Sequence, residues 1–234
     1  MLSAIAIVPS APVLVPELAG AAAAEVTDLA AAVLAAAALL PARWMVIGTG
    51  RHDDVLGPDG PNSMGTFAGF GADVRVQLSP RAHDGAEPPV ELPVCALLAA
   101  WVRGQVRPEA TAQVRLYCID HDADTVLSCG RRLRAEIDQL PDPIGVLVVA
   151  DGANTLTPAA PGGYDPDNAA AQLALDDALA NGDIAVLTRL PQQILGRVAF
   201  QVLAGLAEPG PRSAKELYRG APYGVGYFAG AWQP

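Results

Sequence analysis

Two short segments each place an imidazole among carboxylates. His52 lies in the run RHDD (51–54), and His121 lies in the run DHDAD (120–124). A histidine beside a carboxylate can act as a general base, or it can bind a metal ion while the carboxylate orients the ring. At both segments the alternative is a solvated polar loop that hydrogen-bonds to its own backbone. If a metal ion binds, we expect its ligands to be His52, Asp53 and His121.

The DHDAD run begins like a calcium-binding loop, but its continuation excludes one. Such a loop needs glycine at its sixth position and glutamate at its twelfth, where this chain has Thr125 and Arg131. We therefore expect Asp122 or Asp124 to cap the helix that follows.

A second set of polar residues follows short apolar runs that are typical of buried strands. Ser10 follows one such run, His52 follows another, and Asp151 follows a third. In an open α/β sheet the ligand crevice forms outside the carboxyl ends of the strands. We predict that a small-molecule pocket there is lined by Ser10, His52, Asp151, Asn154, Thr155 and Tyr164.

No nucleophile motif or phosphate-binding loop is present. The chain has no G-x-S-x-G, and the turn at 48–50 lacks the last glycine of a dinucleotide fingerprint and the lysine of a P-loop. Ser10 would be a nucleophile only if His52 or His121 approached it. His83 lies in a Pro/Gly-rich stretch, where we expect it to be exposed.

Strands and helices are predicted to alternate along the chain. Runs rich in Val and Ile predict strands at 4–8, 44–48, 74–78, 114–119 and 145–150, and the tail 221–232 alternates like a strand. Helical spacing of apolar residues occurs at 22–39, 93–103, 125–140, 166–181 and 191–207. This order predicts an α/β fold with a central, mainly parallel or mixed sheet and helices on both faces. Without an internal repeat or a long linker, we expect residues 1–234 to form a single domain.

Composition excludes several classes of protein. With 51% hydrophobic and 17% charged residues, the chain is not intrinsically disordered. A net charge of −10 argues against nucleic acid or an anionic membrane as a partner. The longest apolar run, 29–40, is too short to span a bilayer, and the proline-rich N-terminus has no secretory pattern. The three cysteines form no CxxC pair, so we expect a cytoplasmic protein with reduced thiols.

Five segments taken in order carry a family resemblance. They are IVPSAPVLVPE (7–17), VIGTG (46–50), VVADGAN (148–154), APGGYDP (160–166) and APYGVGY (221–227). Together they resemble the class III extradiol ring-cleavage dioxygenase superfamily, catalytic subunit-B type, which includes protocatechuate 4,5-dioxygenase, and especially a small actinobacterial branch of it. The resemblance implies a dioxygenase-like α/β fold. In active members it also implies Fe(II) held by two histidines and a carboxylate, with a further histidine as acid/base for aromatic ring opening.

The chain departs from the family at the positions that hold iron. Ser10 stands where the family's Pro-His-x-Pro pattern places the first ligand, and Gly50 occupies the register of the second, with His52 two residues later. The segment expected to carry the acid/base histidine reads NTL (154–156), and 188–207 contains no Asp or Glu for the carboxylate ligand. The resemblance therefore implies a dioxygenase scaffold with a degenerate iron site, and no cofactor is expected.

Three functions follow as hypotheses. The leading one is a small-molecule-binding or weakly catalytic protein. The second is an active Fe(II) ring-opening dioxygenase whose metal site is displaced to His52 and His121. The third is an interaction subunit of a homo- or hetero-oligomer, with the aromatic tail around Tyr227 and Trp232 as its interface. The ligand remains open in all three.

Overall fold

A seven-stranded sheet lies at the centre of the molecule, with strand order β3-β6-β2-β7-β1-β9-β8. The structure is a computed structural model that describes residues 1–58, 63–80 and 89–234. Strands β6, β2, β7 and β1 are parallel, whereas β3 joins one edge antiparallel and the β8–β9 hairpin joins the other through β9. The strands are β1 (Leu2–Val8), β2 (Arg43–Gly50), β3 (Asp54–Leu56), β6 (Thr111–Cys118), β7 (Ile144–Val149), β8 (Ser213–Gly220) and β9 (Tyr227–Gln233).

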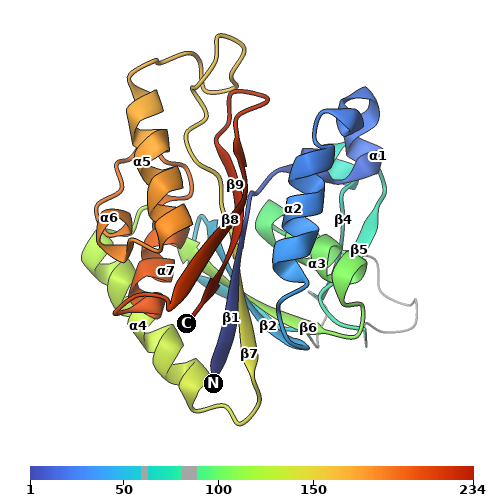
Figure 1. Cartoon of the computed structure of the whole chain (residues 1–234). Coiled ribbons are helices and arrows are strands. Elements are labelled where there is room, and N and C mark those ends of the chain that lie inside the picture. Colours follow the sequence, from blue (N-terminus) through green and yellow to red (C-terminus); the bar gives the residue numbers. More distant parts are fainter. Residues whose placement is uncertain (59–62, 81–88) are drawn as a thin grey trace.

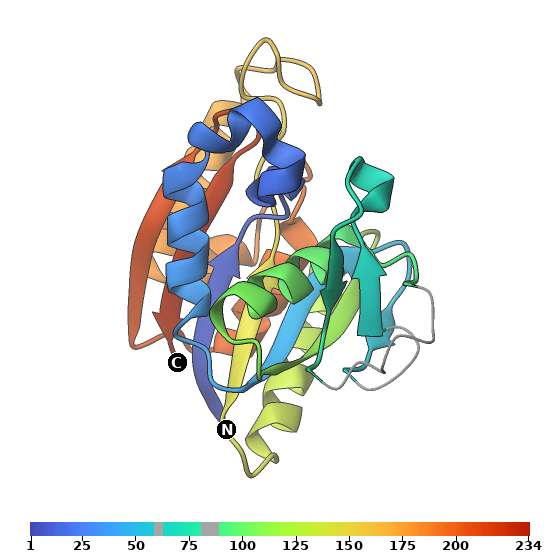
Figure 2. The ribbon, with the colours of Figure 1, turned by 90° about the vertical axis from the view of Figure 1, so that its right-hand side faces the viewer.

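Helices cover both faces of this sheet, as Figures 1 and 2 show. On one face lie α1 (Pro16–Ala19), α2 (Thr27–Ala37) and α3 (Val94–Val106), and on the other lie α4 (Ala123–Asp138), α5 (Asn168–Asn181), α6 (Ile184–Leu187) and α7 (Arg197–Ala207). Each face has its own core, with Leu29 and Leu98 on the first and Phe200 and Leu203 on the second. The predicted single α/β domain with a mixed sheet and helices on both faces is confirmed.

The sequence explains why the central strands and α7 are buried. Strands β1 and β7 read LSAIAIV and IGVLVV, which are nearly continuous apolar runs suited to a sheet covered on both faces. Helix α7 is buried along most of its length and crosses α4 closely at Gly130 and Gly205. A Cβ at Gly130 would lie 2.2 Å from the carbonyl oxygen of Val202, so this helix pair requires glycine there.

Several predicted elements are present with changed bounds or partners. The run 74–78 contains only a short strand, β5 (Arg75–Gln77), which pairs with β4 (Met64–Thr66) in a separate two-stranded sheet. The expected helix at 22–39 begins with a 3₁₀ turn and becomes α-helical only at Thr27, and the one expected from 191 begins at Arg197. Strands β3 and β8 were not predicted, because neither contains an apolar run.

The aromatic tail is part of the core. It forms β9, and Tyr227, Phe228 and Trp232 are all buried. The indole Nε1 of Trp232 donates a hydrogen bond to the carbonyl oxygen of Leu179, 2.7 Å away. These side chains stabilise the sheet and are therefore not available as a subunit interface. No helix in the described part of the chain is both long and apolar enough to cross a membrane.

The chain diverges at the carboxyl ends of β1 and β7. These strands are neighbours, yet β1 leads to α2 on one face of the sheet while β7 leads to α5 on the other. Such a divergence opens a crevice at the edge of the sheet, where ligands bind in many α/β proteins. This edge lies at the top of Figure 1, below the segment that joins β7 to α5.

Candidate functional site

Two of the predicted pocket residues meet at this divergence. The backbone N–H of Ser10, just after β1, donates a hydrogen bond to Oδ1 of Asp151, just after β7, over 2.7 Å. The bond joins the two strand exits. It therefore fixes the Asp151 carboxyl at the place where the fold favours a ligand.

The Asp151 carboxyl is largely withdrawn from water. This burial raises its pKa to about 6, although the hydrogen bond from Ser10 opposes the shift. No described residue donates to its second oxygen, Oδ2. The neighbouring Tyr227 is 6% exposed, and burial together with the Asp151 charge raises the pKa of its hydroxyl, which stays protonated. Asp151 can thus gain or lose a proton near neutral pH, and one of its oxygens is left for a ligand.

Backbone hydrogen bonds hold the segment that carries Asp151. Its carbonyl oxygen accepts from the N–H of Gly196 over 2.8 Å, at the start of α7. The next residue, Gly152, donates to the carbonyl oxygen of Gly226 over 2.8 Å, and Gly226 donates to that of Ala153 over 2.8 Å. The exit of β7 is therefore clamped between α7 and the approach to β9. A rigid support of this kind keeps a binding group in place.

A buried side chain of α5 completes the clamp. Gln172 Oε1 accepts from the N–H of Ala153, and Gln172 Nε2 donates to Oδ1 of Asp176, both over 2.8 Å. A Cβ at Gly152 or Gly226 would lie 2.0 or 2.1 Å from Gln172 Oε1, so a side chain at either position would displace the Gln172 amide from its hydrogen bonds. Burial raises the pKa of Asp176 to about 6. Sequence reasoning missed this pair, because α5 has no distinct apolar face against which buried polar residues would stand out.

Three further predicted pocket residues belong to the segment between β7 and α5. Asn154 packs against Gly162, and Thr155 Oγ1 accepts a hydrogen bond from Asn168 Nδ2 over 2.8 Å. Tyr164 is 56% exposed and makes no hydrogen bond with any other described residue. Asn154 and Thr155 thus hold the shape of this segment, which rises above the sheet in Figure 1.

A second cluster lies at the exits of β2 and β6. His121 Nε2 lies 2.8 and 2.9 Å from the two carboxylate oxygens of Asp53, and the N–H of Cys118 donates to Asp53 Oδ1 over 2.7 Å. Burial alone would raise the pKa of Asp53, but the hydrogen bonds from His121 and Cys118 lower it overall. This arrangement is a solvent-accessible, hydrogen-bonded pair of side chains from two loops.

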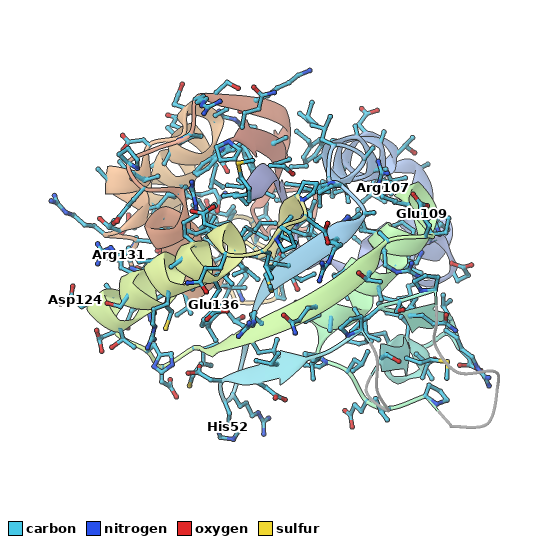
Figure 3. The ribbon with its side chains drawn as sticks, turned by 90° about the horizontal axis from the view of Figure 1, so that it is seen from below. His52, Arg107, Glu109, Asp124, Arg131 and Glu136 are labelled. Carbon is cyan, nitrogen blue, oxygen red and sulfur yellow. The ribbon has the colours of Figure 1, made fainter. Side chains whose placement is uncertain are left out.

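His52 does not join this cluster. Its side chain is exposed, points away from the sheet in Figure 3, and makes no hydrogen bond with another described residue. The nearby Asp122 is the N-cap of α4 and accepts from the N–H of Thr125 over 2.9 Å, which confirms the predicted cap. The third histidine, His83, lies outside the described residues.

The residues do not fit the Fe(II) site that the resemblance implies. Within 1–58, 63–80 and 89–234, no three His, Cys, Asp or Glu side chains are grouped so that they could hold a metal ion. Ser10, at the first ligand position, contributes its N–H to Asp151.

Comparison with known proteins shows the fold and no more. No family model matches the chain, and no curated protein is recognisably similar in sequence. Among solved structures, the crystal structure of an uncharacterized protein, JW3007 from Escherichia coli K12, matches with a TM-score of 0.56. The match covers 98% of this chain and 99% of that chain, at 11% sequence identity. The two proteins share an architecture over their whole length, while the link to the dioxygenases remains unconfirmed.

Proposed function

We propose that the chain is a small-molecule-binding protein on a dioxygenase-like scaffold, with its ligand at the carboxyl ends of β1 and β7. The observation that carries this proposal is the Asp151 carboxyl. It is withdrawn from water, held by the N–H of Ser10, and has one oxygen without a donor among the described residues. A partly buried carboxyl in this state gains free energy from a ligand that donates a hydrogen bond to it.

The chemistry of Asp151 defines the class of ligand. Above pH 6 the group is mostly a carboxylate that accepts hydrogen bonds, so it suits a hydroxyl or an N–H of the ligand. The Tyr227 hydroxyl remains protonated beside it and can donate to an oxygen of the same ligand. A pKa near neutrality also suits weak general acid–base catalysis at this carboxyl. The ligand is therefore a small polar molecule with at least one donor and one acceptor.

The alternative of a displaced Fe(II) dioxygenase has one observation in its favour, the contact between His121 and Asp53. A facial triad needs a third protein ligand. The His52 side chain forms no hydrogen bond with His121 or Asp53 and points away from the sheet. We therefore keep the binding protein as the conclusion.

A thermal-shift screen tests the proposal. Small hydroxylated and amino compounds are screened at pH 7.5 in the presence of a chelator, on the wild type, Asp151→Asn and the control Asp53→Asn. At about 100 times its dissociation constant a ligand stabilises the folded state by roughly 2.7 kcal/mol. We expect compounds that stabilise the wild type and Asp53→Asn but not Asp151→Asn. Stabilisation that is equal in Asp151→Asn, or that appears only when the chelator is replaced by Fe(II), would overturn the proposal.

A further inference from the structure

A hollow lies at the carboxyl edge of the sheet, between the segment that follows β6 and the start of α7. Its volume is about 360 Å³, which falls within the usual range of small-molecule pockets. Its lining comes from both segments but includes neither Ser10 nor Asp151, so this hollow is separate from the proposed site. In α/β proteins this edge of the sheet is where ligands bind.

Two opposite charges line this hollow without pairing with each other. They are Asp120, two residues after the end of β6, and Arg197, the first residue of α7. No ion pair within the described part of the chain includes either residue, and the Asp120 carboxylate accepts no hydrogen bond from it. The neighbouring carboxylates are engaged elsewhere, Asp53 by His121 and Asp122 as the N-cap of α4. The lining therefore holds one unpaired carboxylate and one unpaired guanidinium, and its net charge is zero.

The guanidinium of Arg197 is held in place by neutral acceptors. Its Nη1 donates to Oε1 of Gln201 over 3.1 Å, and its Nη2 donates weakly to the carbonyl oxygens of Ile119 and His121, at 3.4 and 3.5 Å. Gln201 is 2% exposed, and its Nε2 donates to the carbonyl oxygen of Thr188 over 3.2 Å. A buried amide that is fixed at both ends thus positions a guanidinium without a counter-ion. The Arg197 Nε has no acceptor among the described residues and is left for a ligand.

Most of the remaining lining is apolar. Ile119 and Leu195 are each 50% exposed, although both side chains are large and aliphatic. Ile194 and Val198 line the same hollow from buried positions. A ligand that covered the exposed pair would remove apolar surface from water, which favours binding. The hollow thus combines an anion, a cation and an apolar wall.

We propose that this hollow binds a small zwitterion, a compound that carries an ammonium and a carboxylate on one aliphatic chain. The carboxylate of the ligand accepts hydrogen bonds from Arg197, and its ammonium donates to Asp120. The aliphatic chain lies against Ile119 and Leu195. A simple carboxylate would be repelled by Asp120, and a simple amine would be repelled by Arg197. The site is independent of the proposed function at Asp151.

An NMR titration tests this site with norleucine and 6-aminohexanoate as the probes. The two are isomers that differ in the distance between their charges, and hexanoate and hexylamine carry a chain of the same length with one charge each. We expect at least one isomer to shift the amide signals of Ile119, Leu195 and Val198, and to bind about tenfold tighter than either singly charged compound. The isomer that binds tighter defines the spacing of the charges in the ligand. Equal binding of hexanoate or hexylamine, or no shift of these amides with either isomer at millimolar concentration, would overturn the proposal.

Two variants remove the charges one at a time. Asp120→Asn should abolish the preference for the zwitterion over hexanoate, and Arg197→Gln should abolish its preference over hexylamine. Asp124→Asn and Arg189→Gln make the same changes at exposed residues outside the lining and should leave both preferences unchanged. Asp120 is exposed and makes no described hydrogen bond, so its variant keeps the test decisive even if the loss of Arg197 disturbs the fold. A preference over hexanoate that survives in Asp120→Asn, or that is lost equally in Asp124→Asn, would contradict the assignment.

Discussion

Asp151 and Asp53 both follow a strand of the parallel sheet at its carboxyl edge, Asp151 after β7 and Asp53 after β2. Burial raises the pKa of Asp151 to about 6, and its one described donor is the N–H of Ser10. At Asp53 burial is outweighed by hydrogen bonds from His121 and Cys118, and the pKa falls. The same residue type at equivalent strand ends thus has its pKa shifted in opposite directions.

The difference comes from what covers each strand exit. The segment after β7 lies under the start of α7, the approach to β9 and the buried Gln172. The Asp53 side chain is 56% exposed and meets a histidine at the surface. Burial raises the pKa of a carboxyl group toward neutral pH. A carboxyl group that is exposed to water stays ionised at neutral pH and can pair with a neighbouring donor. Four changes test how firmly this contrast holds.

Replacing Gln172 with Leu should have the largest effect, because it removes the support of the covered exit. The buried N–H of Ala153 loses its acceptor and Asp176 loses its donor. Each buried group left without a partner costs about 1 to 3 kcal/mol, so we expect a total loss of roughly 2 to 6 kcal/mol in the free energy of unfolding. Urea denaturation measures it. The exposed Gln193→Leu is the matched control, and an equal loss in both variants would show that Gln172 gives no special support.

Asp151→Asn should stabilise the protein above pH 6. The folded-state pKa of Asp151 is about 6 and its ordinary value is 3.8, so its favourable contribution is complete below pH 3.8 and is lost as pH rises through 6. Removing the ionisable group at pH 7.5 should therefore add on the order of 1 to 3 kcal/mol to the free energy of unfolding. At pH 4 the gain should almost vanish. Denaturation curves at both pH values measure this, and a gain that does not depend on pH would show that the carboxyl is not withdrawn from water.

The pair of His121 and Asp53 should contribute little. Both side chains are partly solvent-exposed, and ion pairs of this kind contribute about 0.2 to 1 kcal/mol. A double-mutant cycle with His121→Ala and Asp53→Asn at pH 6 measures the coupling free energy. Because the pKa of Asp53 is lowered, its contribution should be present at neutral pH and disappear as pH falls through that lowered value. A coupling free energy above about 2 kcal/mol would mean that the pair of His121 and Asp53 is shielded from water, as the Asp151 carboxyl is.

His52→Ala should change stability least, by less than about 0.5 kcal/mol, since the side chain is exposed and makes no described hydrogen bond. It should also leave ligand stabilisation at Asp151 unaltered. Thermal denaturation with and without a hit from the screen measures both. If the ligand no longer stabilised His52→Ala, His52 would be part of the ligand pocket, as the sequence predicted.

The strands of the parallel core could be predicted because each contains a short, mostly apolar run, and their common direction placed Ser10 and Asp151 at one edge. The contact between those two residues depends on β1 and β7 being neighbours, which follows from the order of the strands in the sheet. Strand β8 was not predicted, because its alternating polar residues suit an edge strand as well as a loop.

The clamp around Asp151 could not be predicted from spacing. Gln172 and Asp176 lie on an Ala-rich helix without a distinct apolar face, so nothing local marks them as buried. Their burial arises because Gly152 and Gly226 bring two backbones from distant parts of the chain against α5. His52 was expected in the pocket from its position after β2, but the direction of a loop side chain is not determined by the strand before it.

The position of β1 has a consequence for folding. Its partners are β7 and β9, so Ile5 pairs with Val146 on one side and with Trp232 on the other. Pairings between residues so distant in sequence are entropically costly to form and slow the search for the native state. During synthesis β1 emerges before both of its partners and cannot be covered on both sides until β9 has left the ribosome. Its apolar residues stay exposed while the chain between β1 and β9 is made, and slower synthesis or a chaperone that shields β1 should raise the yield of folded protein.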